Sequence, residues 1–218
     1  MAVSPLAAQR EAIVRVCGRL FQRELIAGQD GNVSVRLPRG RVLVTPAGLS
    51  KVDVRARDLV ELRLDGTKVR GERNASSEVL VHLAAYVARP DVMAVVHAHP
   101  PTATGFAVAG VPLDYDALAE LVYNVGRVPT VPYLMPGTRA LAERVAEDLL
   151  THDVVLLANH GALSVGPTLT IAHQRMESLE HAARILLVAR QLGGVTRMSA
   201  EDVRALEQRR PSPPRHSQ

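Results

Sequence analysis

Apolar residues recur along this chain at two different spacings, which predict helices alternating with strands. A spacing of three to four residues predicts helices at about 5–27, 74–89, 101–110, 137–150 and 168–192, and from about 199 onward. Alternating or β-branched apolar runs predict strands at about 32–37, 41–46, 58–64, 92–96, 153–159 and 161–166, with an extended segment at 128–134. Between 112 and 128 the pattern is weak and indicates at most a short helix.

This order of elements predicts a layered, mixed α/β fold with the strands in the middle and helices on both sides. The length of 218 residues suits one large domain or two small ones. No glycine-rich turn of the dinucleotide-binding type and no P-loop is present in the sequence, which disfavours nicotinamide and nucleoside triphosphate chemistry.

Composition narrows the class of protein. Hydrophobic residues make up 47% of the chain and aromatic residues only 3%, so leucine, valine and alanine must fill the core. The formal net charge is +4, and part of the positive charge lies among the prolines of the last ten residues, 209–218, which we expect to be a disordered tail. Basic residues are not interleaved with aromatic ones, so we expect no nucleic-acid partner, and phosphorylated small molecules remain an alternative anionic partner.

The single cysteine and the lack of targeting signals favour a cytoplasmic protein. Cys17 excludes an intramolecular disulfide, fits a reducing compartment and falls within a helical pattern as a small core residue. No segment has the layout of a signal peptide, and no apolar run approaches the length of a membrane span. We therefore expect no membrane association.

Three histidines are candidate metal ligands. On an extended segment His97 and His99 point to the same side, where two imidazoles can share a divalent cation, although such a pair also occurs as ordinary polar residues. His160 lies in a turn between two predicted strands and would complete a catalytic zinc site of three protein ligands and an open position. The alternative for His160 is a simple turn residue.

The start of the predicted helix at 74–89 carries the sequence Ser-Ser-Glu. Glu78 in the first turn can direct its carboxylate into a cleft, but the helix dipole alone also favours glutamate there. Ser76 and Ser77 are ordinary N-terminal residues of a helix, and their hydroxyls with the free N–H groups can equally bind a phosphate.

The remaining histidines have plainer interpretations. His82, one turn after Glu78, is expected to be a partly buried helix residue that could brace Glu78. The others are expected at surface or interface positions of the long helix (His173 and His181) or in solvent (His152 and His216).

Five segments together resemble the class II aldolase/adducin family: GQDGNVSVR (28–36), VTPAGLSK (44–51), ASSEVLVHLAAYVARPDVMAVVHAHP (75–100), PGTRALAERV (136–145) and LLANHGAL (156–163). They follow in order over about residues 5–205 and are most similar to the L-fuculose-phosphate aldolase branch. The resemblance implies one domain over 1–208, a three-layer α/β/α sandwich with a central mixed, mainly antiparallel sheet. It also implies a homo-oligomer, a C4 tetramer with active sites between subunits.

Residue roles follow from the same resemblance. It implies one Zn²⁺ per subunit on His97, His99 and His160, with Mn²⁺ or Co²⁺ as alternative metals, and Glu78 as the catalytic acid/base. A tyrosine from the neighbouring subunit would protonate the leaving aldehyde, with Tyr115 as the first candidate and Tyr123 as the second. The substrate phosphate would lie against Gly31, Asn32, Gly48, Ser76 and Ser77.

The activity implied is cleavage of a ketose 1-phosphate, similar to L-fuculose 1-phosphate, to dihydroxyacetone phosphate and a short aldehyde through a zinc-stabilised enediolate. Alternatives on the same scaffold are a sugar-phosphate dehydratase, a decarboxylase or a 4-epimerase, and Ser-Ser-Glu argues against the epimerase because that pattern carries aspartate. A non-catalytic, adducin-like interaction module is the alternative outside enzymes.

The chain departs from the family pattern at three places. Asp30 stands where close relatives carry alanine, and a carboxylate there would repel a phosphate unless it points away. Ala47 replaces a hydroxyl residue of the phosphate site. No aromatic residue follows Tyr133, where the family has a further tyrosine, so a different aldehyde preference is expected.

Overall fold

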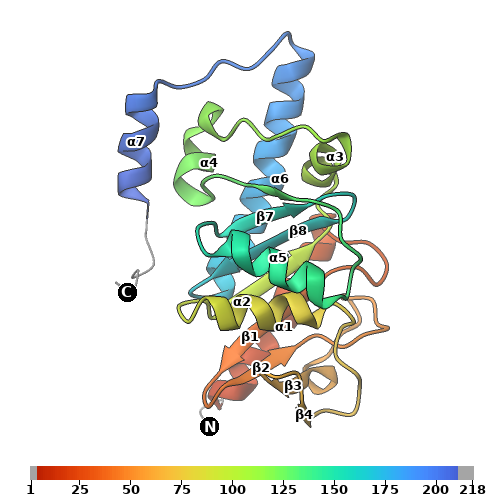
Figure 1. Ribbon diagram of the computed structural model, residues 1–218. Coiled ribbons are helices and arrows are strands. Elements are labelled where there is room, and N and C mark those ends of the chain that lie inside the picture. Colours follow the sequence, from red (N-terminus) through yellow and green to blue (C-terminus); the bar gives the residue numbers. More distant parts are fainter. Residues whose placement is uncertain (1–3, 211–218) are drawn as a thin grey trace.

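Helices cover both faces of one eight-stranded sheet in the computed structural model, which describes residues 4–210 (Figure 1). The strand order is β4-β3-β2-β1-β5-β8-β7-β6, and within these residues only β6 and β7 pair in parallel. The strands are β1 (Asn32–Leu37), β2 (Arg41–Val44), β3 (Val60–Arg63), β4 (Lys68–Arg70), β5 (Ala94–Ala98), β6 (Thr130–Val131), β7 (Val154–Leu157) and β8 (Gly161–Gly166).

The other regular elements within the described residues are seven α-helices and two short 3₁₀ helices. They are α1 (Pro5–Gln22), η1 (Ala56–Asp58), α2 (Val79–Ala88), α3 (Pro101–Ala109), η2 (Tyr115–Ala117), α4 (Ala119–Asn124), α5 (Arg139–Leu149), α6 (Leu169–Gln191) and α7 (Ala200–Arg209). Side chains of Ser4, Thr138, Thr168 and Ser199 cap the N-termini of α1, α5, α6 and α7, which explains where these helices begin.

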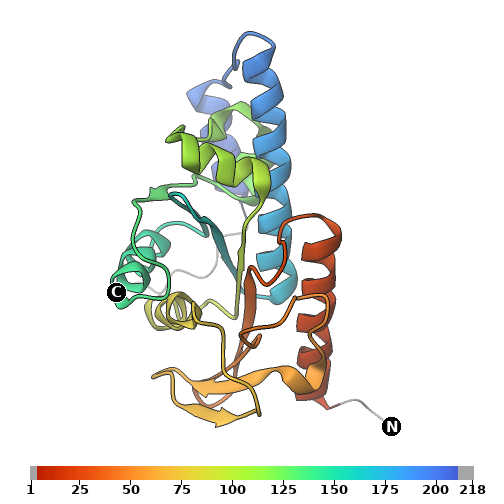
Figure 2. The same ribbon diagram turned by 90° about the vertical axis from the view of Figure 1, so that its right-hand side faces the viewer.

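The three layers are visible from the side, with α1 and α6 on one face of the sheet and α2 and α5 on the other (Figure 2). Each face has its own apolar cluster. Along β5, Val96 and Ala98 belong to the cluster under α1 and α6, whereas Val95 belongs to the cluster under α2 and α5. Because side chains alternate along a strand, His97 projects to the same face as Val95. The predicted α/β/α sandwich with a mixed, mainly antiparallel sheet is confirmed.

Some element boundaries differ from the prediction for identifiable reasons. Helix α1 ends at Gln22 rather than near 27, because Glu24 adopts a left-handed φ of 58° and the chain then turns Leu25 and Ile26 into the core. Strand β4 escaped prediction because all three of its residues are exposed, which leaves no apolar alternation. The stretch from 112 to 128 contains η2 and α4.

Two boundary shifts concern the histidines and the serines. Strand β5 runs two residues beyond the predicted end, so His97 lies inside the strand rather than after it. Helix α2 begins at Val79 rather than near 74, because Ala75 forms a β-bridge with Pro46 and the serines precede the helix.

Helix α7 extends into the first residue of the predicted tail. Arg209 is the last residue of α7, and Arg210 forms an ion pair with Asp153 at 2.8 Å. Residues 211–218, including Arg215 and His216, lie outside the described part, so a disordered tail stays a prediction for them. Cys17 is buried in the core as expected, and burial raises the pKa of its thiol to about 12. Within residues 4–210 every helix is too short or too polar to cross a membrane.

Candidate active site

His97 is fixed at the centre of the sheet. It pairs with Asn32 of β1 on one side and with Leu163 of β8 on the other, and its side chain is 1% exposed. Its ring nitrogen Nδ1 lies 2.9 Å from the carbonyl oxygen of Ala162, to which it donates. The other ring nitrogen of His97, Nε2, therefore faces Glu78 and the pocket.

His99 and His160 approach His97 from two loops. The backbone N–H of His99 donates to the carbonyl oxygen of Leu25 at 2.9 Å, which fixes the chain just after β5. His160 lies in the turn between β7 and β8, where Asn159 takes a left-handed φ of 56°. The three ring centroids are 4.8–5.1 Å apart. The structure thus brings together the three histidines that the sequence singled out.

Glu78 faces two of these rings from the N-cap of α2. Its Oε2 lies 2.9 Å from Nε2 of His97, and its Oε1 lies 2.9 Å from Nε2 of His160. Burial raises the pKa of Glu78, but the hydrogen bonds from His160 and His97 outweigh it, so the pKa lies below its ordinary value. Glu78 is therefore a carboxylate at neutral pH.

The donor set fits a divalent cation. One atom from each of Glu78, His97, His99 and His160 lies within 4.8 Å of the others. Nε2 of His97 and Nε2 of His99 are only 3.2 Å apart, so both nitrogens can direct a lone pair to one cation. Burial, with the charge on His97, lowers the pKa of His99 to about 4, so that ring is a neutral ligand at pH 7. Three imidazoles with one carboxylate suit Zn²⁺ and related transition metals.

A buried hydrogen-bond chain supports Glu78 from behind. The amide nitrogen of Asn32 donates to Glu78 at 3.4 Å, and its amide oxygen contacts Nε2 of His82. Nδ1 of His82 lies 2.7 Å from the hydroxyl of Ser34, which lies 2.8 Å from that of Tyr86. Burial lowers the pKa of His82 to about 3, so the ring is neutral and donates through Nε2. His82 therefore braces Glu78 through Asn32, and it is fully buried rather than partly buried as predicted.

One pocket of about 350 Å³ joins the metal cluster to the predicted phosphate residues. Glu78, His99 and His160 line one part of it, with His97 directly beneath Glu78. The remaining lining residues are Gln29, Asp30, Gly31, Asn32, Pro46, Ala47, Gly48, Lys51, Ser76 and Ser77. The five residues predicted to hold a phosphate thus lie together beside the metal cluster, although their role stays a prediction.

The structure does not bring the candidate tyrosines to this pocket within one chain. Tyr115 lies in η2, where its hydroxyl donates to Glu207 at 3.4 Å and its ring lies under the guanidinium of Arg127. Tyr123 is on α4, and neither tyrosine is among the described residues that line the pocket. A role for Tyr115 therefore depends on a neighbouring subunit.

Of the other histidines, His173 contradicts the prediction of a surface or interface position. It is buried on the inner side of α6, next to Ala172 and Met176, and its Nδ1 lies 3.5 Å from Glu177. His181 is exposed, as expected for its position on α6. His152 is half-buried rather than solvated, because its Nδ1 donates to the carbonyl oxygen of Asp148.

Sequence reasoning missed one residue of the pocket and the partner of another. Lys51 is 3% exposed, and its ammonium donates to the carbonyl oxygens of Gln29 at 2.7 Å and Leu49 at 3.0 Å. A lysine three residues after Gly48, in a chain with only two lysines, was the available signal. Asp30 directs its carboxylate to His99 rather than standing free beside the phosphate residues.

Two glycines permit the close approach of these loops. Gly31 has a φ of 69°, and a Cβ there would lie 2.9 Å from the carbonyl oxygen of His97. At Gly161 a Cβ would lie 2.6 Å from both the carbonyl oxygen of Ala98 and the ring of His99. Any side chain at 161 would thus collide with the segment that carries two metal ligands.

We predict that Gly161→Ala destabilises the fold by about 1–3 kcal/mol, as overpacking typically does, and weakens metal binding by displacing His99. Denaturant unfolding and chelator competition measure the two effects. Gly18→Ala is the matched control, since a Cβ there would meet no described atom within 4 Å and helix propensity favours alanine. A Gly161→Ala protein with the stability and metal affinity of the wild type would refute this account of the site.

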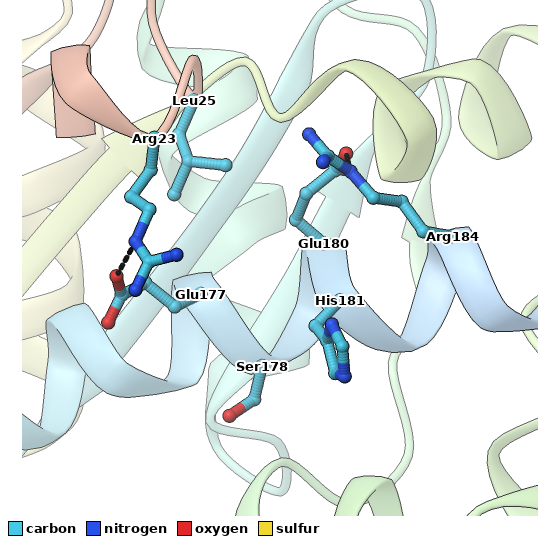
Figure 3. A pocket seen from close by; sticks show the side chains of 7 residues that line it. All are labelled: Arg23, Leu25, Glu177, Ser178, Glu180, His181 and Arg184. Carbon is cyan, nitrogen blue, oxygen red and sulfur yellow. Dashed lines mark hydrogen bonds and ion pairs between the residues drawn. The ribbon is translucent and has the colours of Figure 1, made fainter.

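A second pocket of about 410 Å³ lies between the end of α1 and α6 (Figure 3). Its charged groups are paired with one another, Arg23 with Glu177 and Arg184 with Glu180. Glu180 also accepts hydrogen bonds from the backbone N–H groups of Thr102 and Ala103, at the start of α3. Glu180 therefore holds the start of α3, just after His99. Because the charged groups of this pocket are paired with one another, they do not converge on a ligand as those of the first pocket do.

Comparison with known proteins assigns the family. Residues 11–187 match the model of the class II aldolase and adducin N-terminal domain. The chain is 35% identical over 185 residues to a 3-oxo-tetronate 4-phosphate decarboxylase of Escherichia coli, covering 82% of this chain and 86% of that protein. It is 34% identical over 187 residues to a 5-deoxy-D-ribulose 1-phosphate aldolase of Bacillus thuringiensis, covering 85% and 87%.

A solved structure agrees with these relatives. The fold superposes on an L-fuculose 1-phosphate aldolase with a TM-score of 0.87 at 29% identity, covering 95% of this chain and 97% of that one. The matched region contains all three histidines and Glu78. The chain therefore belongs to the class II aldolase/adducin family.

Proposed function

We propose that this protein is a metal-dependent lyase that breaks a carbon–carbon bond next to a ketone in a small phosphorylated sugar or sugar acid. The observation that carries the proposal is the convergence of three imidazoles and Glu78 in one pocket with Asn32, Gly48 and the Ser76-Ser77 pair. The family supports it, since class II aldolases are metal-dependent and the cluster here can bind a metal.

His97, His99 and His160 would hold one divalent cation per chain, which we propose to be Zn²⁺, with Mn²⁺ and Co²⁺ as the alternatives to compare. When bound, such a cation supplies Lewis-acid stabilisation of the negative charge that develops on the substrate oxygens. Neutral imidazole ligands leave the charge of the cation uncompensated. Glu78, held by Asn32 and facing the same cluster, delivers a proton to the substrate carbon.

The phosphate would bind at the other side of the pocket. Asn32, Ser76 and Ser77 offer side-chain donors there, and Gly31 and Gly48 leave the backbone accessible. The buried ammonium of Lys51 adds positive charge beneath the same loops and compensates for the carboxylate of Asp30. This explains how an anionic substrate can bind although Asp30 lines the pocket.

Decarboxylation of a 3-oxo acid phosphate is the first candidate reaction, because the residues of one chain suffice for it. In a four-carbon 3-oxo acid 4-phosphate, the electrons of the C1–C2 bond pass to C2 as CO₂ leaves. Glu78, which is ionised in the resting site, takes a proton from solvent and passes it to C2, which gives dihydroxyacetone phosphate. The carboxylate of the substrate is already ionised, so no base has to remove a proton from the substrate. The 35% identical Escherichia coli decarboxylase supports this candidate.

Aldol cleavage of a ketose 1-phosphate is the second candidate, favoured by the relatives that are aldolases. It leaves the same carbanion and the same dihydroxyacetone phosphate, but the other product is an aldehyde. A second group must remove the proton of the C4 hydroxyl. We propose Tyr115 of a neighbouring subunit for this role, in a C4 tetramer with sites between subunits. Its phenolate would accept the proton of the C4 hydroxyl in cleavage, and its phenol would return that proton to the aldehyde oxygen in the reverse reaction.

Product analysis tests the proposal. We expect the metal-loaded protein to form dihydroxyacetone phosphate from 3-oxo-tetronate 4-phosphate with an equimolar amount of CO₂. Dihydroxyacetone phosphate with an equimolar aldehyde, formed from a ketose 1-phosphate instead, would establish the aldolase. If the protein binds metal but cleaves neither substrate, that result contradicts carbon–carbon bond cleavage and favours the dehydratase or the epimerase. A protein that binds no divalent metal favours a non-catalytic interaction module.

A further inference from the structure

We infer that Asp30 is a positioning residue for His99 and thereby sets the metal affinity of the site. The inference rests on the metal site of the proposed function and adds a residue to it. Oδ2 of Asp30 lies 3.3 Å from Nδ1 of His99, on the side of the ring opposite to Nε2. The chain thus has a carboxylate–histidine pair at the edge of the metal cluster.

His99 depends on this contact more than His97 does. The ring of His97 is buried and held through Nδ1 by the carbonyl oxygen of Ala162. The side chain of His99 is a quarter exposed, and among residues 4–210 its Nδ1 forms an ion-pair contact with Asp30. A carboxylate at Nδ1 fixes the proton there, orients the ring and leaves the Nε2 lone pair for the cation.

The loop that carries Asp30 is held at several points. The backbone N–H of Asp30 donates to the carbonyl oxygen of Ala27 at 2.9 Å, and the carbonyl oxygen of Gln29 accepts a hydrogen bond from the ammonium of Lys51. The following residue, Gly31, is packed against Ile26 and the backbone of His97. The carboxylate of Asp30 is half exposed, but the backbone of this loop is fixed. The carboxylate can therefore hold the ring of His99 in one orientation.

The test compares Asp30→Ala and Asp30→Asn with the wild type in the absence of substrate. Chelator competition gives the affinity for Zn²⁺, and the visible absorption of the Co²⁺-loaded protein reports the geometry of the ligands. We expect Asp30→Ala to bind Zn²⁺ about 10–100-fold more weakly, the usual effect of losing such a partner, with an altered Co²⁺ spectrum. Asp30→Asn keeps an acceptor and should lose less.

Asp53→Ala, an exposed aspartate on a nearby loop, is the matched control and should bind metal as the wild type does. Thermal unfolding of the metal-free proteins checks that each variant folds. If the wild type binds Zn²⁺ and Asp30→Ala binds it equally well with an unchanged Co²⁺ spectrum, the inference is overturned and the metal site stands. If the wild type binds neither cation, the metal site and this inference fall together.

Discussion

Replacing His97 by alanine should empty the metal site and lower the turnover rate by about 10³-fold or more. The variant removes one of three imidazole ligands and leaves His99 and His160 with Glu78 alone. Lewis-acid stabilisation contributes several kcal/mol to such reactions, and each 1.36 kcal/mol corresponds to a factor of ten in rate. Metal analysis of the purified variant and product formation under saturating Zn²⁺ measure the two losses.

Because His97 is buried at the centre of the sheet, its removal also leaves a void and removes the contact with the carbonyl oxygen of Ala162. His160→Ala separates ligand loss from this structural damage, since His160 lies in a turn and is partly exposed. It should lose the metal to the same extent. His181→Ala, at an exposed position of α6, should keep both metal and rate. Stoichiometric metal in both ligand variants would refute the assignment of the site.

The arrangement of layers follows from the sequence because apolar periodicity reports burial. Helix α6 was predicted almost to the residue, since Thr168 caps its start and apolar residues recur through its length. Local patterns carry no such information on strand order. The pairing of β1 with β5, which brings Asn32 opposite His97, joins residues 65 apart, and no local pattern predicts it.

The end of α1 shows how tertiary packing overrides a local pattern. Leu25 and Ile26 continue the apolar spacing of the helix, but they enter the core from a turn. The carbonyl of Leu25 is thereby free to accept the backbone N–H of His99. The early end of the helix therefore places this turn against the segment that carries His99.

The candidate site was partly visible in the sequence. The alternation of His97 and His99 is a local signal, and His160 in a predicted turn and Glu78 at a predicted helix start were candidates that the family resemblance then joined to them. The partners of these residues were not predictable, because they depend on how loops meet. Asp30 was expected to repel a phosphate unless it pointed away, and its contact with His99 was not predicted. His82 was a candidate to brace Glu78, but its action through Asn32 was not predicted.

Glu78→Gln should retain the metal and slow turnover by about 10²–10⁴-fold, the usual range for a lost general acid or base. Glutamine has the same shape, so the contact with Asn32 and the packing at the start of α2 can persist. The amide cannot deliver the proton to carbon. We expect kcat and kcat/KM to fall together, because the proton transfer contributes in the transition state and not to substrate binding.

The position of the new C–H bond gives a sharper readout. In D₂O the wild type should place one deuterium on the product carbon with a single configuration, because Glu78 approaches from a fixed side. In Glu78→Gln the carbanion should be protonated by solvent, with mixed configuration. Glu143→Gln, exposed on α5, is the matched control and should behave as the wild type. Wild-type rates and a single configuration in Glu78→Gln would remove Glu78 from proton transfer and leave it a neighbour of the metal ligands.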